Sequence, residues 1–414
     1  MNGKRAFELL KKIGFVRMGG TCEEKKAANI LKEEVEKIGG EAKIEEFDVC
    51  GNEITEVKLE VLEPNYKEYK VTGFLNSGST GKEGLVGDFY YVSTESTVDL
   101  ENAKGKIVLI NGAMGRNLYK KLVEAGIIGF ITYNGDLKDN YEDVDIAYPE
   151  LREPLREIKV LPGVNMKVHD AVDLVLSEAT KVKITLNQVE KQVSSRNVIA
   201  EIEGSEKKDE VIVFTAHFDS VRYSTGVYDN GAGSVINMEA YRYFMENKPK
   251  RTLKFIWCGS EERGLLGSKA YVKAHEEELK NVKFNINCDV AGPVLGRDVV
   301  FATANNEVLN YCKSLGSEIG FPANYVLDTY SSDGIPFADK GIASVSITRF
   351  GSMGTAYIHN RHDVIKYLDY KNLEKTGNYL ITLAKKIDDS KYMPFDTKVS
   401  DEVKDKVDKY LFKK

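Results

Sequence analysis

The chain of 414 residues is 42% hydrophobic and 29% charged, and it carries a formal net charge of −6. This length favours two domains, and the composition is that of a soluble globular protein. The negative charge gives no reason to expect nucleic acid or a membrane surface as a partner. No apolar run approaches the roughly 18 residues that a membrane span requires, and the N-terminus lacks the apolar core of a signal peptide.

The five cysteines are scattered along the chain and form no Cys-x-x-Cys pair. Their odd number and their spacing argue against a disulfide framework and against a thiolate metal site. We therefore expect a reducing compartment and a cytoplasmic location.

The N-terminal segment predicts one helix followed by two strands. Thr21 and Glu24 have the spacing of a capping box, and apolar residues at helical spacing follow as far as Gly39. Segments 43–49 and 54–62 then alternate between apolar and polar residues, which is typical of strands.

The pattern changes between residues 69 and 186. Glycine-rich turns separate short apolar strands, of which 105–110 and 128–133 are the clearest, and a short helix is expected at 118–125. The polar stretch 135–159 is interpreted as a surface loop, because none of its carboxylates lies beside a histidine. We predict a small β-rich inserted domain over 69–186 without chemistry of its own.

An α/β pattern resumes at residue 197 and continues through the rest of the chain. Strands are expected at 211–214, 253–258, 282–288, 299–303 and 343–348, with helices at 234–245 and 370–387. This order predicts a mixed open α/β sheet flanked by helices, formed by residues 1–68 and 187–392. Such sheets bind ligands at the carboxyl ends of their strands. Residues 393–414 are a C-terminal tail with a charged amphipathic helix, which we expect to be peripheral.

Histidine and carboxylate residues follow several of these strands directly. In chain order they are His217 and Asp219, then Asp229, then Glu261 and Glu262, then Asp289, and finally His359, His362 and Asp363. Histidine with carboxylate and no thiolate suits zinc in a hydrolytic site, and manganese and cobalt also suit it. Two neighbouring metals need one ligand that bridges them, and this set contains enough carboxylates to supply it.

Each of these motifs also has an ordinary structural interpretation. Taken alone, His217-x-Asp219 is a local hydrogen-bonding pair, Glu261-Glu262 is a solvated turn, and Asp229-Asn-Gly is a tight turn. A carboxylate at Asp289, after an apolar strand, is costly unless it is paired or binds metal. Because all of them follow strand ends in succession, we favour a common site.

The ordered set resembles the dizinc aminopeptidase family, which includes the secreted bacterial aminopeptidases, aminopeptidase Y and glutamate carboxypeptidase II. The motifs that carry the resemblance are His217-Phe-Asp, Asp229-Asn-Gly-Ala-Gly, Glu261-Glu-Arg-Gly-Leu-Leu-Gly-Ser, Asp289 and His359-x-x-x-Asp363. The family implies a zinc exopeptidase fold for the α/β domain. Segments 105–110 and 161–164 are similar to the protease-associated (PA) domain that many members carry as an insertion.

The resemblance implies a role for each metal ligand. His217 and Asp289 would bind one zinc ion, Glu262 and His359 would bind the other, and Asp229 would bridge the two. His359 is preferred to His362 because it has the family's spacing to the following acid.

Further roles follow from the same resemblance. Asp219 would hold the ring of His217, and Glu261 would be the general base that deprotonates the attacking water. Many members place a tyrosine directly before the last histidine, where it stabilises the oxyanion. Here Ile358 takes that position, and Tyr357 is the candidate for the role.

We therefore expect a metal-dependent aminopeptidase that acts on peptides with two Zn²⁺ ions. The alternatives are a carboxypeptidase or dipeptidase on the same centre, a non-catalytic relative of the receptor type, and an acyltransferase of the glutaminyl-cyclase type.

Overall fold

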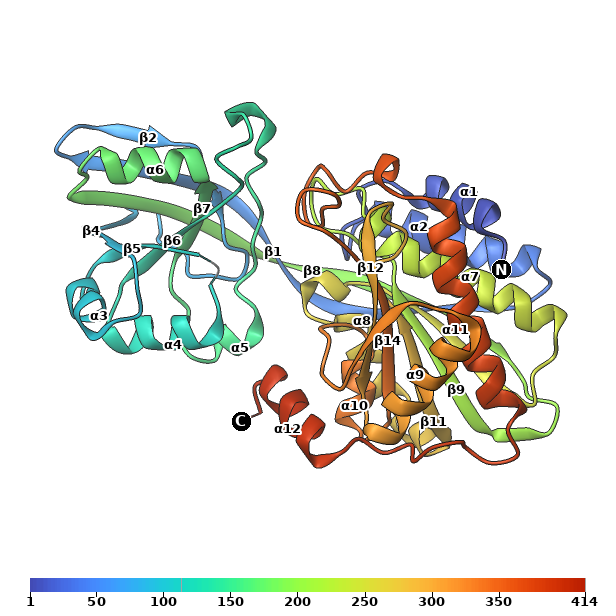
Figure 1. Cartoon of the computed structure of the whole chain (residues 1–414). Helices are drawn as coiled ribbons and strands as arrows, with labels where there is room; N and C mark the ends of the chain where they lie inside the picture. Colours follow the sequence, from blue (N-terminus) through green and yellow to red (C-terminus); the bar gives the residue numbers. More distant parts are fainter. Residues whose placement is uncertain (113, 414) are drawn as a thin grey trace. The chain divides into compact units, whose positions relative to one another are not determined.

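The computed structural model describes residues 1–112 and 114–413. Ala113, within the predicted inserted domain, and Lys414, at the end of the predicted tail, lie outside the described residues. The chain divides into two compact units (Figure 1). The larger comprises Met1–Val49 and Ser194–Lys414, and the smaller comprises Cys50–Val193.

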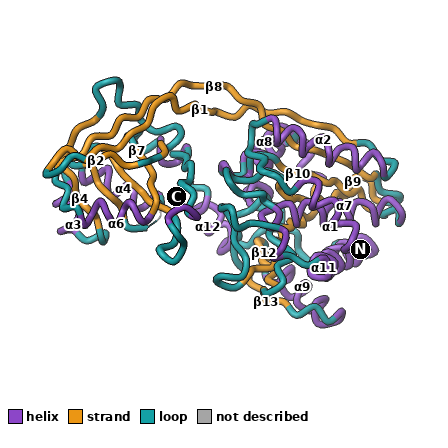
Figure 2. Tube along the Cα trace, turned by 90° about the horizontal axis from the view of Figure 1, so that it is seen from above, coloured by secondary structure: helices purple, strands orange, loops and turns teal. Residues whose placement is uncertain are grey.

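The boundaries of the smaller unit differ from the predicted insertion at 69–186. The reason is a pair of long strands, β1 (Ala42–Glu63) and β8 (Lys181–Ile202), which pair with each other and belong to both units (Figure 2). The two strands expected at 43–49 and 54–62 are therefore one strand. Glycine is uncommon inside strands, so Gly51 suggests a strand end, but strand β1 continues through it.

The larger unit is built on a mixed sheet in the order β13-β12-β14-β11-β9-β10-β8. Its central strands β14, β11, β9 and β10 run parallel to one another, while β8 and β12 are antiparallel to their neighbours β10 and β14. The bounds of these strands are β9 Lys207–His217, β10 Arg251–Cys258, β11 Val282–Cys288, β12 Gly296–Thr303, β13 Ala323–Val326 and β14 Ser344–Gly351. The predicted fold class, a mixed open α/β sheet flanked by helices, is confirmed.

Helices cover both faces of this sheet. One face packs against α1 (Gly3–Ile13), α2 (Cys22–Lys37), α7 (Ala232–Glu246), α9 (Asn306–Ile319) and α11 (Tyr370–Asp389). The other face packs against α8 (Leu266–Ala274) and α10 (Ile335–Asp339). Short helical turns lie at Val227–Gly231, Glu261–Arg263, Glu276–Asn281 and Ile365–Tyr367.

Strand β9 shows how the alternating sequence divides the core between the two faces. Ile212 and Phe214 point to the α7 side, where the ring of Phe214 stacks on Phe255 with centroids 4.4 Å apart. Val213 points to the opposite side and packs with Phe337 of α10. This period of two is the expected geometry of a strand that is buried on both faces.

The C-terminal tail, expected to be a peripheral amphipathic helix, forms a surface helix that is attached to the rest of the larger unit through two buried residues. Helix α12 (Asp401–Tyr410) packs against α10, and its Val403 and Val407 are fully buried. These two valines are four residues apart and share one helix face, whereas the other faces carry charged residues that conceal the contact in the sequence.

The smaller unit has its own sheet, in which β4, β5, β6 and β7 run parallel, β8 and β3 are antiparallel to its outer strands, and β2 pairs with β1. Its strands are β2 Lys67–Tyr69, β3 Thr72–Gly73, β4 Leu85–Val92, β5 Ile107–Ile110, β6 Gly129–Asn134 and β7 Gly163–Lys167. Its helices are α3 Thr97–Ala103, α4 Arg116–Ala125, α5 Glu153–Arg156 and α6 Val168–Leu176, with a short turn at Tyr141–Asp143. Among the helices that the structure describes, none is long and apolar enough to cross a membrane.

Candidate metal centre

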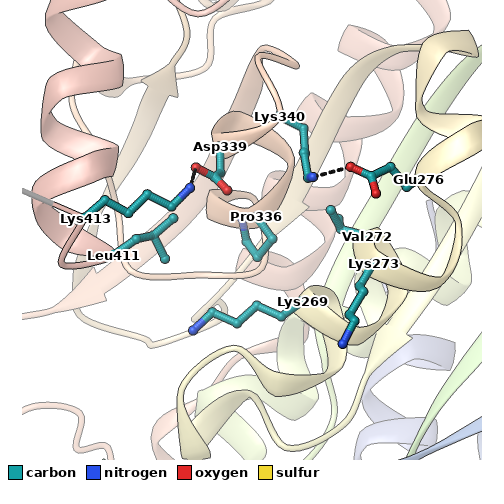
Figure 3. Close-up of a pocket in the computed structure, with 9 residues that line it drawn as sticks. All are labelled: Lys269, Val272, Lys273, Glu276, Pro336, Asp339, Lys340, Leu411 and Lys413. Atoms are coloured by element: carbon teal, nitrogen blue, oxygen red, sulfur yellow. Dashed lines mark hydrogen bonds and ion pairs between the residues drawn. The ribbon is translucent and has the colours of Figure 1, made fainter. Parts of the chain in front are cut away.

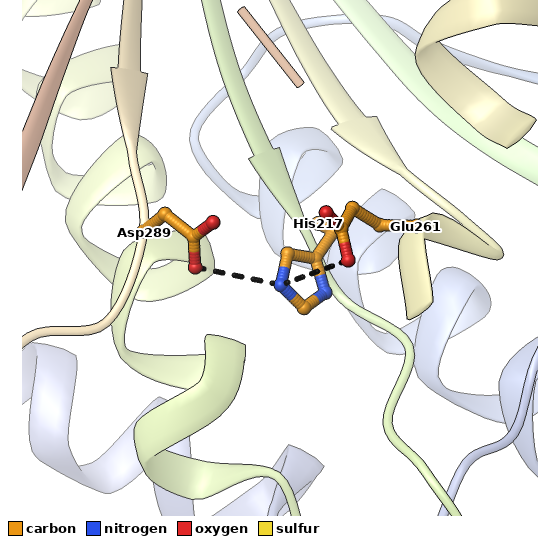
Figure 4. A group of neighbouring side chains, drawn as sticks. All are labelled: His217, Glu261 and Asp289. Carbon is orange, nitrogen blue, oxygen red and sulfur yellow. Dashed lines mark ion pairs between the residues drawn. The ribbon is translucent and has the colours of Figure 1, made fainter. Parts of the chain in front are cut away.

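The topology of the larger unit brings the strand ends together. Strands β11, β9 and β10 are parallel neighbours, so their carboxyl ends lie at the same edge of the sheet. His217 is the last residue of β9, Asp289 follows β11 directly, and Glu261 lies on the turn after β10. Figure 4 shows these three side chains converging.

His217, Glu261 and Asp289 form the first group of candidate ligands. Their ligand atoms lie within 4.8 Å of one another, and all three residues are buried. His217 Nε2 is 3.5 Å from Asp289 Oδ1 and 3.8 Å from Glu261 Oε2. A small cation therefore fits between the imidazole and the carboxylates.

The second group consists of Asp229, Glu262 and His359. His359 Nε2 lies 3.1 Å from Asp229 Oδ2 and 3.0 Å from Glu262 Oε2. His359 comes from the loop after β14, and its side chain is half-exposed, so this group faces the open side of the centre.

Asp229, a member of the second group, also contacts the first. Its Oδ1 lies 3.1 Å from His217 Nε2, while its Oδ2 lies 3.1 Å from His359 Nε2. One carboxylate thus turns one oxygen toward each histidine, which is the arrangement that a ligand shared by two metals requires.

Two neighbouring side chains hold Asp229 in place. The Asp363 carboxylate accepts the backbone N–H of Tyr228 at 2.8 Å and that of Asp229 at 3.2 Å. The Asn230 amide donates to the Cys288 carbonyl at 2.9 Å and accepts the backbone N–H of Val290 at 3.2 Å. Asp363 and Asn230 thereby fix the bridging residue relative to the end of β11.

Asp219 connects His217 with the glutamate turn. Its two carboxylate oxygens accept the backbone N–H groups of Glu261 at 3.0 Å and Glu262 at 3.3 Å, and Oδ1 lies 3.4 Å from His217 Nδ1. The side chain is fully buried. One carboxylate therefore orients the ring of His217 and both glutamates together.

Burial and mutual repulsion disfavour the charged form of three carboxylates in the centre. Burial raises the pKa of Glu261 well above its usual value, although His217 opposes the shift. Burial and the charge of Asp229 raise the pKa of Glu262 to about 7, and burial also raises the pKa of Asp289. A divalent cation would offset these repulsions.

The residues therefore fit a zinc site. Nitrogen from histidine and oxygen from carboxylate are ligands that zinc takes in catalytic sites. Asp289 Oδ1 is buried, and among residues 1–112 and 114–413 it has no hydrogen-bond partner. That atom points at His217 Nε2, as a metal ligand would.

The structure places His359, rather than His362, among the candidate ligands. The ring of His362 lies 5.4 Å from that of Tyr357, and Tyr357 also approaches Tyr367 at 6.3 Å. The predicted oxyanion residue Tyr357 thus packs within an aromatic group on the loop that carries His359.

The sequence interpretation missed Tyr330, which lies on an irregular segment before α10. Its ring stacks on Phe301 with centroids 5.1 Å apart. Burial raises the pKa of Tyr330 well above its usual value, and the charges of Asp289, Asp229 and Glu261 raise it further. The hydroxyl is therefore within electrostatic reach of the centre. No periodicity or local motif marks this residue.

Arg17 is a second residue that was not assigned a role. Its guanidinium is fully buried and donates to the backbone carbonyls of Phe218, Thr225 and Gly226. These hydrogen bonds fix the backbone of the segment that connects His217 with Asp229. A single arginine in a loop gives no signal of this role in the sequence.

Comparisons with known proteins agree with this geometry. Residues 197–384 match the model of peptidase family M28. The chain is 28% identical to aminopeptidase YwaD of Bacillus subtilis over an alignment of 385 residues. That alignment covers 89% of this chain and 80% of YwaD. The chain is also 28% identical over 249 residues to carboxypeptidase Q of Xenopus laevis, covering 56% and 52%. The solved structure of BSAP, a zinc aminopeptidase from Bacillus subtilis, superposes with a TM-score of 0.79 at 25% identity and covers 97% of this chain and 98% of that chain.

Proposed function

We propose that this metal-dependent aminopeptidase, whose residues 197–384 form a domain of peptidase family M28, holds two zinc ions at the edge of its main sheet. The observation that carries the proposal is the position of Asp229, whose two oxygens lie 3.1 Å from His217 and 3.1 Å from His359. His217 and Asp289 would hold one ion, Glu262 and His359 the other, and Asp229 would bridge them. When bound, zinc polarises the scissile carbonyl and lowers the pKa of the attacking water toward neutrality.

Glu261 is the proposed general base. Its buried carboxylate lies 3.8 Å from His217 Nε2, whereas Asp229 Oδ1 lies nearer to the same atom, at 3.1 Å. Asp229 is therefore the better placed of the two carboxylates to share a metal ion with His217. The ligand set is therefore complete without Glu261, which is left to accept a proton from the attacking water. The carboxyl group would hold that proton and then donate it to the leaving amine.

Asp219 is the proposed positioning residue for the base. It accepts the N–H groups of both glutamates, and so it fixes the backbone of the turn while Glu261 moves its proton. The same carboxylate keeps the ring of His217 in the orientation that turns Nε2 toward the centre.

The oxyanion of the transition state needs a hydrogen-bond donor near the centre. Tyr330 is half-buried, and it is supported by the charges of Asp289, Asp229 and Glu261, which raise its pKa. Tyr357 is supported by its place on the loop that carries His359. Replacing each tyrosine by phenylalanine and comparing the two values of kcat assigns the role.

The aminopeptidase proposal is tested with aminoacyl-p-nitroanilides and their N-acetylated forms, using zinc-loaded protein. We expect cleavage of the free substrates alone, and a Glu261→Gln variant that keeps its zinc but loses about 10²–10⁴-fold in kcat. Equal cleavage of acetylated substrates would overturn the aminopeptidase assignment. Cleavage only of peptides with a free C-terminus would establish the carboxypeptidase alternative.

We also propose that Cys50–Val193 is a protease-associated domain and that the protein is cytoplasmic. The first proposal is supported by the parallel strand β5, which lies where the sequence matches that domain. The second is supported by the odd number and scattered spacing of the five cysteines. Cell fractionation tests the location.

A further inference from the structure

The turn that carries both glutamates has a strained backbone. Ser260 has φ 52° and Leu265 has φ 62°, so two residues other than glycine adopt the left-handed conformation at either end of the turn. Leu265 donates its backbone N–H to the Glu261 carbonyl at 2.8 Å, and Gly264 does the same at 2.8 Å. The position of Leu265 therefore determines the position of Glu261.

Such a conformation persists only where the surroundings hold it. The side chain of Leu265 is 1% exposed and lies in a separate buried cluster with Ile335, Ala338, Val403 and Val407. The last two residues belong to α12 and the first two to α10. The C-terminal helix thus completes the apolar pocket that anchors the end of the glutamate turn.

Helix α12 also contacts the segment that carries Tyr330. The hydroxyl groups of Tyr410 and Ser331 are hydrogen-bonded, and Lys406 Nζ lies 3.3 Å from Asp328 Oδ1. These contacts flank Tyr330 on both sides in the sequence. One helix therefore holds two parts of the centre, the glutamate turn and the tyrosine segment.

The residues after α12 strengthen this attachment. Figure 3 shows Leu411 and Lys413 beside Pro336 and Asp339 of α10, and Lys413 forms an ion pair with Asp339. The tail is thus held by apolar contacts and by charged contacts at its outer end.

We propose that α12 is a positioning element of the aminopeptidase, acting on Glu261 through Leu265 and on Tyr330 through Ser331. This inference rests on the proposed function of both residues. It predicts that loosening α12 lowers kcat more than it changes KM, because Glu261 and the adjacent ligand Glu262 move together with the turn, while the zinc ligands on β9 and β11 stay in place.

The test is the double substitution Val403→Ala and Val407→Ala in the full chain, with Lys404→Ala and Lys409→Ala as the matched control. Both lysines lie on the exposed face of the same helix. Activity on a free aminoacyl-p-nitroanilide is measured well below the unfolding midpoint of each variant, together with zinc content. Hydrogen exchange is followed in peptides that cover residues 259–266 and 327–333.

For the valine variant we expect kcat to fall about tenfold or more, with KM within about threefold, since small displacements of a catalytic group cost that much. The zinc site of His217 and Asp289 should stay occupied, whereas the site that Glu262 completes should bind zinc more weakly. Exchange should be faster in both segments. The lysine control should match the wild type. A valine variant that is less heat-stable but has unchanged kcat and unchanged exchange would overturn the proposal.

Tyr410→Phe provides a second test if the valine variant does not fold. It keeps both valines and removes the hydroxyl contact with Ser331. Faster exchange in 327–333 with a reduced kcat supports the proposal, and no change in either contradicts it. A wild-type protein without aminopeptidase activity would instead contradict the proposed function, and the exchange measurements would still decide whether α12 holds the two segments.

Discussion

Substitution of Asp219 by asparagine perturbs the centre without removing any proposed metal ligand. The aspartate accepts the N–H groups of Glu261 and Glu262 and lies 3.4 Å from the Nδ1 atom of His217. Asparagine has nearly the same shape but offers only one acceptor oxygen. Its NH₂ group would face the backbone N–H of Glu261 or of Glu262, and two donors cannot form a hydrogen bond.

The size of the effect follows from these contacts. A hydrogen bond to a charged group contributes about 1.5–3 kcal/mol, and a buried donor without a partner costs a similar amount. We therefore expect Asp219→Asn to lose about 2–3 kcal/mol of stabilisation in the arrangement of the centre. This corresponds to about 30–160-fold in kcat/KM or in zinc affinity, at the upper end of the range seen when residues that orient metal ligands are changed.

The assay measures kcat/KM on a free aminoacyl-p-nitroanilide and zinc affinity by competition with a chelator. Lys404→Ala serves as the control for a change remote from the centre. If Asp219→Asn retains both quantities within about threefold of the wild type, the positioning role of Asp219 is refuted.

The remaining predictions concern pH, ligand identity and metal removal. Burial raises the pKa of Glu24 to about 7, so the folded state binds an extra proton and loses stability as pH rises from 4.5 through 7. Glu24→Gln should therefore gain up to ~3 kcal/mol relative to wild type between pH 5 and pH 8 in urea unfolding, whereas parallel curves would contradict this. His359→Ala should lose one zinc per chain and most activity, while His362→Ala should retain both; the reverse result would reassign the ligand. Chelation should lower the unfolding midpoint, because carboxylates in the centre then repel one another, and an unchanged midpoint would contradict the charge argument.

Much of the centre could be predicted because its residues follow strands with clear apolar patterns. His217 ends β9 and Asp289 follows β11, and parallel neighbours must bring such residues to one edge. His359 lies on a loop with no periodic pattern, and only the family motif identified it. The sequence offers no local rule that would select Tyr330, whose position depends on packing against Phe301.

The differences between the predicted and the observed fold have a similar cause. Gly51 reads as a strand end, yet β1 continues because its partner β8 lies more than a hundred residues away in the sequence and supplies the pairing. The burial of α12 depends on only Val403 and Val407, and its remaining residues are mostly charged. Local patterns do not reveal contacts that distant segments create.

The central claim is that Asp229 bridges two zinc ions, and anomalous diffraction at the zinc absorption edge tests it most directly. Crystals of the zinc-loaded protein should show two peaks about 3.5–4 Å apart on either side of Asp229. One should lie against His217 and Asp289, and the other against Glu262 and His359. A single peak, or two peaks that do not share Asp229, would contradict the account.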